Sequence, residues 1–322
     1  MNQLLNRLKI DRYLMLLIAM VVLATLLPAR GAVKTFFDGL TVAAIALLFF
    51  MHGARLSRQA LWAGLGHWRL HGVIFAATFV LFPVLGLSMQ WLPESLIPRD
   101  VRAGFLYLCI LPATVQSAIA FTSIARGNVA AAVCSASASS LLGVFLSPLL
   151  AAWLIRVEGE QHLWTAVGAI MLQLLLPFVL GHLSRPVTAG WMTRHHRAVR
   201  AADQGSILLV VYVAFSAAVS AGIWQQVTWK TLVMIGILSC VLLVVVLWWN
   251  TRLARRLGFS REDEIAIVFC GSKKSMVNGI PMANILFPAD IIGIMVLPLM
   301  IFHQIQLMVC AVLAQRYAAR DS

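Results

Sequence analysis

Residues 269–276 read FCGSKKSM and place two adjacent lysines, Lys273 and Lys274, inside an otherwise uncharged span from Ile265 to Phe287. A charged side chain at the centre of a membrane helix costs about 2.5 to 3.5 kcal/mol on insertion scales. Proteins usually offset this cost with a water-filled cavity, an anionic partner or a binding site. The lysine pair is therefore the first place in this sequence to look for a functional site.

The composition of the whole chain indicates that this span crosses a membrane. Of the 322 residues, 61% are hydrophobic and 11% are charged, and the mean hydropathy is +0.89, outside the range of soluble domains. About 20 apolar residues cross a bilayer core. The sequence predicts an all-α, polytopic membrane protein with ten transmembrane helices near 13–29, 38–53, 72–92, 102–125, 129–155, 163–183, 205–225, 230–250, 264–287 and 290–315.

The net charge of +13 is distributed as a topology signal. If the ten spans alternate in direction, 17 of the 25 lysines and arginines lie on the side that holds both termini, and six lie on the other. The positive-inside rule then predicts a multi-pass protein of the inner (plasma) membrane with both termini in the cytoplasm. A signal peptide cleaved near Ala29 would leave nine spans and contradict this bias. Nucleic acid is not an expected partner, because the basic loops lack interleaved aromatic residues.

Motifs that would identify an enzyme are missing from the sequence. It contains no Walker loop, GxSxG, HExxH or dinucleotide-binding fingerprint, which disfavours a self-contained ATP-driven pump and most membrane hydrolases. The five cysteines fall within predicted spans without metal-ligand spacing and are interpreted as small buried apolar residues. We therefore expect a protein that is not an enzyme and that has no metal and no cofactor.

Ten spans divide into two halves of five, residues 1–160 and 161–322. A repeated half with an odd number of spans must be inverted relative to its partner, and inverted repeats with paired broken helices are a recurring plan of secondary transporters. The fourth span carries LPATVQS at 111–117, and the ninth carries GSKKS at 271–275. We therefore expect helices 4 and 9 to be broken at corresponding points, with a binding site near the middle of the membrane.

Each interruption combines a helix-breaking feature with polar side chains. Pro112 removes a backbone hydrogen bond, and nearby hydroxyl and amide groups can replace it. For this proline alone, a simple packing kink is an equal alternative. The small-residue run CSASASS at 134–140 is interpreted as close helix packing, although the same face could line the site. The candidate substrate-binding residues are Thr114, Gln116, Ser117, Lys274, Ser275 and Asn278.

Two polar groups outside these interruptions have a structural and a functional interpretation. His303, close to Gln304 and Gln306 in the last span, could be bonded to a neighbouring helix or could act as a proton relay. Ser260 with Asp263 three residues later is typical of a helix start. Glu264 lies at the membrane edge, where it could be a partner for a lysine.

Three segments carry a resemblance to a known family. They are ARGNVA at 125–130, LTVAAIALLFFMHGA at 40–54 and GHWRL at 66–70. Together with the two broken spans they resemble the bile acid:sodium symporter family, in its YfeH-like branch, which includes the seventh member of the vertebrate bile-acid carrier family. The resemblance covers nearly the whole chain. It implies a panel domain and a core domain, with helices 4 and 9 crossing at their unwound centres, and alternating access for an organic anion.

The resemblance also exposes a departure at the expected sodium sites. Sodium-coupled members typically have a glutamate before the ninth-span glycine and a glutamine and an asparagine after it, where this chain has Phe269, Lys273 and Lys274. Other positions expected to hold sodium ligands carry Ala118, Ala132, Ala136 and Thr78. A site that has lost its acid and gained two ammonium groups repels sodium and attracts an anion. The residues assigned to ion coupling, or to a built-in cation, are Lys273, Thr78, Ser272, Glu264 and His303.

The expected function is secondary transport of a small organic anion, with altered or absent sodium coupling. Lys273 would stand in for the sodium ion, Lys274 would contact the carboxylate, sulfate or phosphate of the solute, and one lysine could release a proton during the cycle. Membrane lipid is the other expected partner. Two alternatives remain open: a regulatory membrane protein that does not transport, and an uncoupled channel or facilitator.

Overall fold

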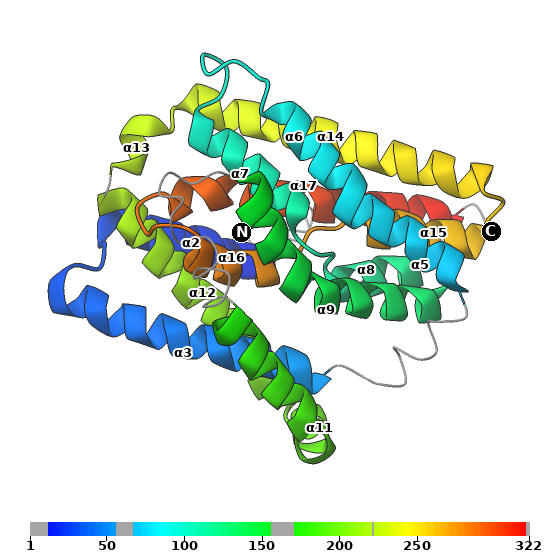
Figure 1. Ribbon diagram of the computed structural model, residues 1–322, viewed down its shortest axis with the longest axis horizontal. Helices are drawn as coiled ribbons and strands as arrows, with labels where there is room; N and C mark the ends of the chain where they lie inside the picture. The colour runs from blue at the N-terminus through cyan, green and yellow to red at the C-terminus, as the bar shows by residue number, and fades with distance from the viewer. Residues whose placement is uncertain (1–11, 56–66, 156–170, 221, 320–322) are drawn as a thin grey trace.

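The computed structural model describes residues 12–55, 67–155, 171–220 and 222–319, and these ranges contain helices and no strand (Figure 1). The predicted all-α class is confirmed. The longer helical elements are α2 (Arg12–Leu26), α3 (Gly31–Arg55), α5 (Trp68–Ala76), η2 (Ala77–Leu81), α6 (Phe82–Met89), α7 (Arg99–Ile110), α8 (Val115–Ile124), α9 (Val129–Leu154), η4 (Met171–Leu175), α11 (Leu176–Arg194), α12 (His196–Ser220), α14 (Trp229–Arg256), α15 (Arg261–Gly271), α16 (Met276–Leu286) and α17 (Ile292–Ala319).

Several of these helices are long and apolar enough to cross a bilayer. Six qualify on their own, and the bent pair of α7 and α8, with 63° between the two parts, makes a seventh. A shorter apolar helix covers Met15–Leu26. These findings confirm a multi-span membrane protein, while the count of ten spans stays a prediction, and part of the predicted span 163–183 lies outside the described residues.

The helices form two groups. In the first, α3 packs along α11 and α2 packs along α12, and Figure 1 shows α3 and α11 at the lower edge, far from α14 at the top. Gly53 and Gly181 allow the close approach of α3 and α11, because a Cβ on either residue would collide with the main chain of the facing helix. In the second group α7 packs on α17 and α6, while α8, α9 and α14 surround α15. Helix α12 joins the groups by contacting α16 and α17.

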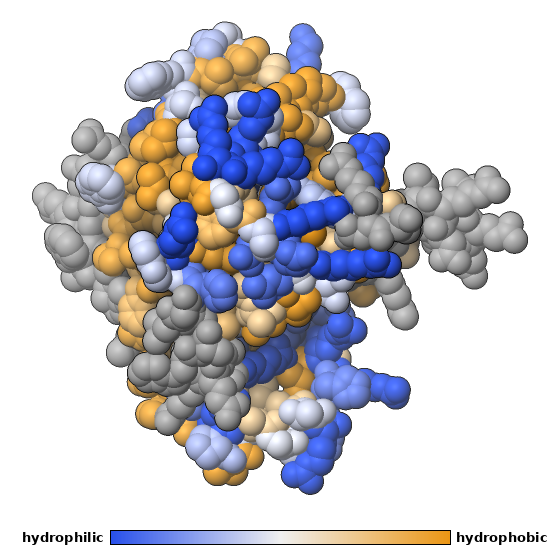
Figure 2. All heavy atoms as spheres, turned by 90° about the vertical axis from the view of Figure 1, so that its right-hand side faces the viewer, coloured by the Kyte–Doolittle hydropathy of each residue, from blue (hydrophilic) through white to orange (hydrophobic). Residues whose placement is uncertain are grey.

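One end of the molecule is strongly hydrophilic. Figure 2 looks onto the end where α14 and α17 finish and α15 begins, and shows hydrophilic side chains gathered among hydrophobic ones. Arg252, Arg255 and Arg256 come from the last turns of α14, and Arg316 comes from the last turn of α17. These cations were expected on one side of the membrane, and they do lie at one end of the molecule.

The motif ARGN at 125–128 forms a tight turn onto α15. Arg126 has a φ of 60°, in the left-handed region that non-glycine residues rarely adopt. Asn128 caps α9 by accepting the N–H of Ala131 at 3.0 Å, and its Nδ2 donates to Asp263 at 2.8 Å. Ser260 caps α15 by accepting the N–H of Asp263, as expected. The motif therefore joins the starts of α9 and α15.

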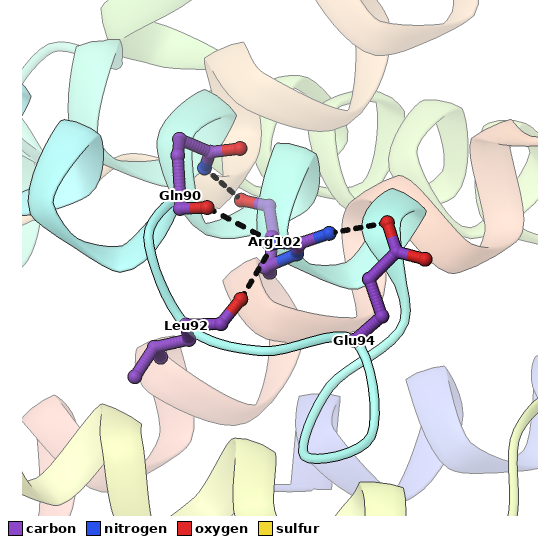
Figure 3. A network of polar contacts seen from close by, with 4 residues as sticks. All are labelled: Gln90, Leu92, Glu94 and Arg102. Atoms are coloured by element: carbon purple, nitrogen blue, oxygen red, sulfur yellow. Dashed lines mark hydrogen bonds and ion pairs between the residues drawn. The ribbon is translucent and has the colours of Figure 1, made fainter.

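Arg102 fastens the connection between α6 and α7 (Figure 3). Its Nη1 donates to the carbonyls of Gln90 and Leu92 at 2.9 and 2.6 Å, and its Nη2 donates to Glu94 at 2.7 Å. In return, Nε2 of Gln90 donates to the Arg102 carbonyl at 2.8 Å. Only 12% of the arginine side chain is exposed. Arg102, which the predicted topology places on the less basic side of the membrane, therefore has a structural role.

Replacing Arg102 with methionine is expected to lower stability by about 2 to 3 kcal/mol, because the half-buried carbonyls lose charged donors. Thermal melting of the purified protein in detergent measures the effect. Glu94→Gln is the matched control: the glutamate side chain is 71% exposed, so its ion pair contributes little. Equal melting temperatures for Arg102→Met and the wild type would contradict the structural role.

Candidate functional site

Two helix interruptions meet inside the bundle. Helix α7 ends at Ile110 and α8 begins at Val115, while α15 ends at Gly271 and α16 begins at Met276. The two intervening segments touch: the Ser275 N–H donates to the Pro112 carbonyl at 2.9 Å, and Thr114 Oγ1 donates to the Lys274 carbonyl at 2.8 Å. Both spans expected to be broken are broken, and their breaks are in contact.

The carbonyl end of α7 needs donors from elsewhere, because the last carbonyls of a helix have no partner within it. Ser147 Oγ donates to the Ile110 carbonyl at 2.7 Å. The carbonyls on either side, Cys109 and Leu111, both accept from Nζ of Lys274, at 2.8 and 2.7 Å. A helix carbonyl end also carries partial negative charge, which favours a cation at this position. The lysine thus neutralises the broken end of α7.

Lys274 is completely buried. Besides Cys109 and Leu111, its Nζ donates to the Thr78 carbonyl at 2.9 Å, so three acceptors match the three donors of an ammonium group. The nitrogen also lies 4.1 Å from the centroid of the Phe82 ring, within the range of a cation–π contact. Carbonyl dipoles and an aromatic face therefore offset the cost of burying this charge.

The Thr78 carbonyl is available because of a π-helical turn. In η2 the Phe82 N–H bonds to the Ala77 carbonyl, five residues back. In the same pattern, the Thr78 carbonyl would accept the N–H of the residue five positions later, but that residue is Pro83, which has no N–H. The Thr78 hydroxyl is occupied by the Ile74 carbonyl at 2.8 Å. Thr78, one of the predicted ion-coupling residues, thus contacts Lys274 through its main-chain carbonyl. In the sequence, Pro83 indicates that this carbonyl has no partner within its own helix.

Gln306 holds the main chain of Lys274 from α17. Its Oε1 accepts the Lys274 N–H at 3.0 Å, and its Nε2 donates to the Lys274 carbonyl, also at 3.0 Å. The same Nε2 lies 2.8 Å from Nδ1 of His303, which is itself 3.3 Å from the Lys274 carbonyl. His303, a predicted ion-coupling residue, therefore lies at the crossing. Gln306 is completely buried and was not among the predicted site residues.

The first break is held in the same way. The Ala113 N–H donates to Oγ of Ser139 on α9, at 3.1 Å. Ala113 directly precedes Thr114, the residue before α8, just as Lys274 directly precedes Ser275, the residue before α16. In each half, a side chain on the helix that follows the broken helix accepts this N–H: Ser139 on α9 accepts from Ala113, and Gln306 on α17 accepts from Lys274.

Lys273 is also completely buried, but it is held more loosely than Lys274. Its Nζ donates to the Gln306 carbonyl at 3.5 Å, the outer limit of a hydrogen bond. The nitrogen lies 4.4 Å from the Phe121 ring centroid and 5.8 Å from that of Phe269. Phe269 stands where the family resemblance implies a glutamate, so an aromatic face occupies the position of the missing carboxylate.

The remaining residues predicted to bind substrate lie around the start of α8 and α16. Ser275 caps α16 by accepting the Asn278 N–H at 3.2 Å, and Nδ2 of Asn278 donates to Ser140 at 3.1 Å. Gln116 is exposed on α8. Within the described part of the chain, the hydroxyls of Ser117 and Ser272 are buried without a hydrogen-bond partner.

Glu264 lies away from the lysines, at the first turn of α15. Its carboxylate accepts Nε and Nη2 of Arg255 at 2.8 and 3.0 Å, and the Tyr317 hydroxyl at 2.8 Å. Glu264 lies seven helical residues before the end of α15 at Gly271, which corresponds to roughly 10 Å along a helix, and Lys273 lies beyond that end. The glutamate therefore ties together the ends of α14, α15 and α17.

A bundle of apolar helices in which two broken helices meet at their interruptions has the organisation of a helical membrane transporter. The chain belongs to the SBF-like CPA transporter family, whose sequence profile matches residues 11–319. The resemblance to the bile acid:sodium symporter family is thereby confirmed.

Three relatives show how similarity is spread over the family. YfeH of Escherichia coli strain K12 is 63% identical over 308 residues, which cover 96% of this chain and 93% of YfeH. Sodium/bile acid cotransporter 7-B of Xenopus laevis is 26% identical over 317 residues, covering 96% and 92% of the two chains. Sodium/bile acid cotransporter 7 of Rattus norvegicus is 27% identical over 273 residues, covering 84% and 80%. The first two matches cover more than 90% of both chains, so the similarity to this transporter family extends over nearly the whole chain.

Proposed function

We propose that this protein is a secondary transporter of a small organic anion, that it works by alternating access, and that the ammonium group of Lys274 replaces a coupling sodium ion. The observation that supports this proposal most directly is the set of three main-chain carbonyls around Nζ of Lys274. Unwound carbonyls and half-helix carbonyl ends are the groups that bind sodium in broken-helix transporters. Here a covalently attached cation occupies such a cage.

A sodium ion beside this ammonium would be strongly repelled. Two unit charges 4 Å apart repel by about 4 kcal/mol at an effective dielectric constant of 20. The names of the cotransporter 7 relatives point to a bile acid as the kind of solute, which is an amphipathic organic anion. A cationic crossing without a sodium site suits such a solute.

We assign the two lysines the reverse of the roles expected from the sequence. A direct contact between Lys274 and a solute would require Nζ to leave three short hydrogen bonds. Lys273 donates to one main-chain carbonyl at 3.5 Å and also interacts with the Cys310 thiol and two aromatic rings, so its charge is the less compensated of the two. We assign to Lys273 the charge that responds to the solute or exchanges a proton during the cycle. The residues proposed to contact the solute are Thr114, Gln116, Ser117, Ser275 and Asn278.

The transport cycle is proposed to rest on two inverted repeats, residues 1–160 and 161–322, that form ten spans with both termini in the cytoplasm of the inner membrane. The matching clamps on the two breaks, Ser139 on Ala113 and Gln306 on Lys274, support this division. Alternating access would then move the group of α2, α3, α11 and α12 against the helices that carry the crossing.

Transport without sodium is the expected result for protein reconstituted into liposomes. A thermal-shift screen of carboxylate, sulfate and phosphate anions, with sodium or potassium as the counter-ion, first selects a bound solute. Uptake of that solute against its gradient should then proceed equally in sodium and potassium buffers. Accumulation only in sodium would overturn the built-in cation. Conductance without accumulation would indicate a channel, and a complete lack of solute movement would favour the regulatory alternative.

A further inference from the structure

A groove of about 680 Å³ lies between α14 and α17, away from the crossing of the broken helices. One wall is apolar and well exposed: Val244 and Trp248 on α14 are 62% and 53% exposed, and Met308 and Val312 on α17 are 55% and 53% exposed. Both helices are long apolar candidates for membrane spans. In a bilayer this face would lie against lipid chains.

The groove changes from apolar to cationic along its length. Arg252 and Arg255 line it on α14, one and two turns beyond Trp248, and Arg316 lines it on α17, one turn beyond Val312. Arg255 is paired with Glu264. Over the ranges the structure describes, the exposed guanidinium groups of Arg252 and Arg316 have no hydrogen bond or ion pair, although Arg252 lies 5.4 Å from the Trp248 ring centroid. Two free cations therefore close one end of an apolar groove.

The dimensions of the groove suit one leaflet of a membrane. From Val244 to Arg252 is eight helical residues, or roughly 12 Å, and half of a bilayer core is about 15 Å thick. Arg252 lies one turn before the end of α14, and Arg316 lies in the last turn of α17, at the hydrophilic end seen in Figure 2. The cations are thus placed where lipid headgroups begin.

We propose that this groove binds one anionic phospholipid, with an acyl chain along the apolar wall and the phosphate between Arg252 and Arg316. Arginine binds phosphate in a fork geometry, and basic pockets at the ends of membrane helices are typical sites for anionic headgroups. A second copy of the chain would oppose this cluster with its own arginines, which like-charge repulsion disfavours. A free inorganic anion would leave the apolar wall unused.

A bound lipid at this position would brace the site indirectly. It would bridge α14 and α17, and α17 carries Gln306, which holds the main chain of Lys274. Arg255, on the same groove, is fixed to Glu264 at the start of α15, which leads to the lysine pair. The proposed lipid site is nevertheless independent of the transport proposal, because it requires only a membrane-embedded chain.

Native mass spectrometry of the full-length protein tests the site. With phosphatidylglycerol added, the wild type should retain one lipid per chain at least tenfold more tightly than with phosphatidylcholine. The double variant Arg252→Gln/Arg316→Gln should lose about tenfold or more of this preference, since each surface arginine contributes to binding an anionic lipid. The matched control Arg197→Gln/Arg200→Gln removes the same charge from exposed positions on α12 and should bind as the wild type does.

Further arms separate the possible occupants. Met308→Trp places a larger side chain in the apolar part of the groove, and should weaken lipid binding while leaving both arginines in place. Inorganic phosphate and soluble organic anions at millimolar concentration should not displace the lipid. An unchanged preference in the groove variant, an equal loss in the control, or displacement by a soluble anion would overturn the proposal. Thermal melting in a neutral detergent verifies that each variant is folded, and an arginine-dependent dimer would assign the groove to a second copy instead.

Discussion

Replacing Lys274 with alanine is expected to turn a sodium-insensitive protein into one that responds to sodium. The substitution leaves the buried carbonyls of Thr78, Cys109 and Leu111 without their donor. Each unsatisfied buried acceptor costs about 1 to 3 kcal/mol, so the variant should lose several kcal/mol of stability. The vacated space is bounded by main-chain oxygens at a half-helix carbonyl end, which is the environment that binds sodium in broken-helix transporters.

Melting temperature in sodium chloride and in potassium chloride at equal ionic strength measures this effect. The wild type should melt at the same temperature in both salts. Lys274→Ala should melt several degrees lower than the wild type in potassium, and sodium should recover part of the difference. Solute uptake by the variant should likewise become sodium-dependent.

Lys273→Ala provides the matched control, because it removes the same group one residue away. That ammonium donates to one carbonyl at 3.5 Å and interacts with the Cys310 thiol and two aromatic rings, so its loss should cost less and create no cage of carbonyls for sodium. If Lys274→Ala keeps full stability, or if sodium and potassium act alike on it, Lys274 does not stand in for a sodium ion.

The positions of the two breaks were predictable because residues at each break are themselves unfavourable in a membrane helix. Pro112 cannot continue the hydrogen-bond ladder of a helix, and two charges with flanking serines are incompatible with an ordinary membrane helix at 271–275. The contact between the breaks was expected from the family resemblance. The hydrogen bond of Thr114 to the Lys274 carbonyl shows that the two interruptions do adjoin.

The different surroundings of the two lysines were not predictable in this way. In a non-helical segment, the directions of adjacent side chains are not fixed by a regular helix and depend on the neighbouring segments that pack against it. Lys274 reaches α7 and η2, whereas Lys273 reaches Phe121 on α8. The cage also depends on main-chain atoms, and only Pro83 gives a sign of the free carbonyl at Thr78. Patterns of side-chain type do not report such groups.

Tertiary partners also explain the position of Glu264. A carboxylate at a helix start, nine residues before a lysine, looked available to that lysine. Arg255 reaches it from α14, a separate helix that ends shortly before α15 begins. Tyr317 reaches it from α17, which lies far from it in the sequence. A partner that comes from another helix can be inferred only once the packing of the helices is known.

Replacing Gln306 with leucine is expected to cost about 2 to 4 kcal/mol of stability and to reduce transport strongly. The change keeps the approximate volume of a completely buried side chain but removes both bonds to the main chain of Lys274. The buried Lys274 N–H then has no acceptor, and an unpaired buried donor costs about 1 to 3 kcal/mol. The segment that carries the lysine also loses its clamp, so the ammonium should be less well placed in the carbonyl cage.

Gln304→Leu is the matched control, since it makes the same change two residues earlier on α17, where the side chain is only half-buried. Melting temperature and sodium-free uptake should be close to wild type for this variant and clearly reduced for Gln306→Leu. The clamp on the first break predicts a parallel effect, because Ser139→Ala removes the acceptor of the Ala113 N–H. Equal behaviour of the two glutamine variants would show that α17 supports the crossing by packing alone. The hydrogen bond of Gln306 to Lys274 would then no longer support, together with that of Ser139 to Ala113, the division of the chain into two repeats.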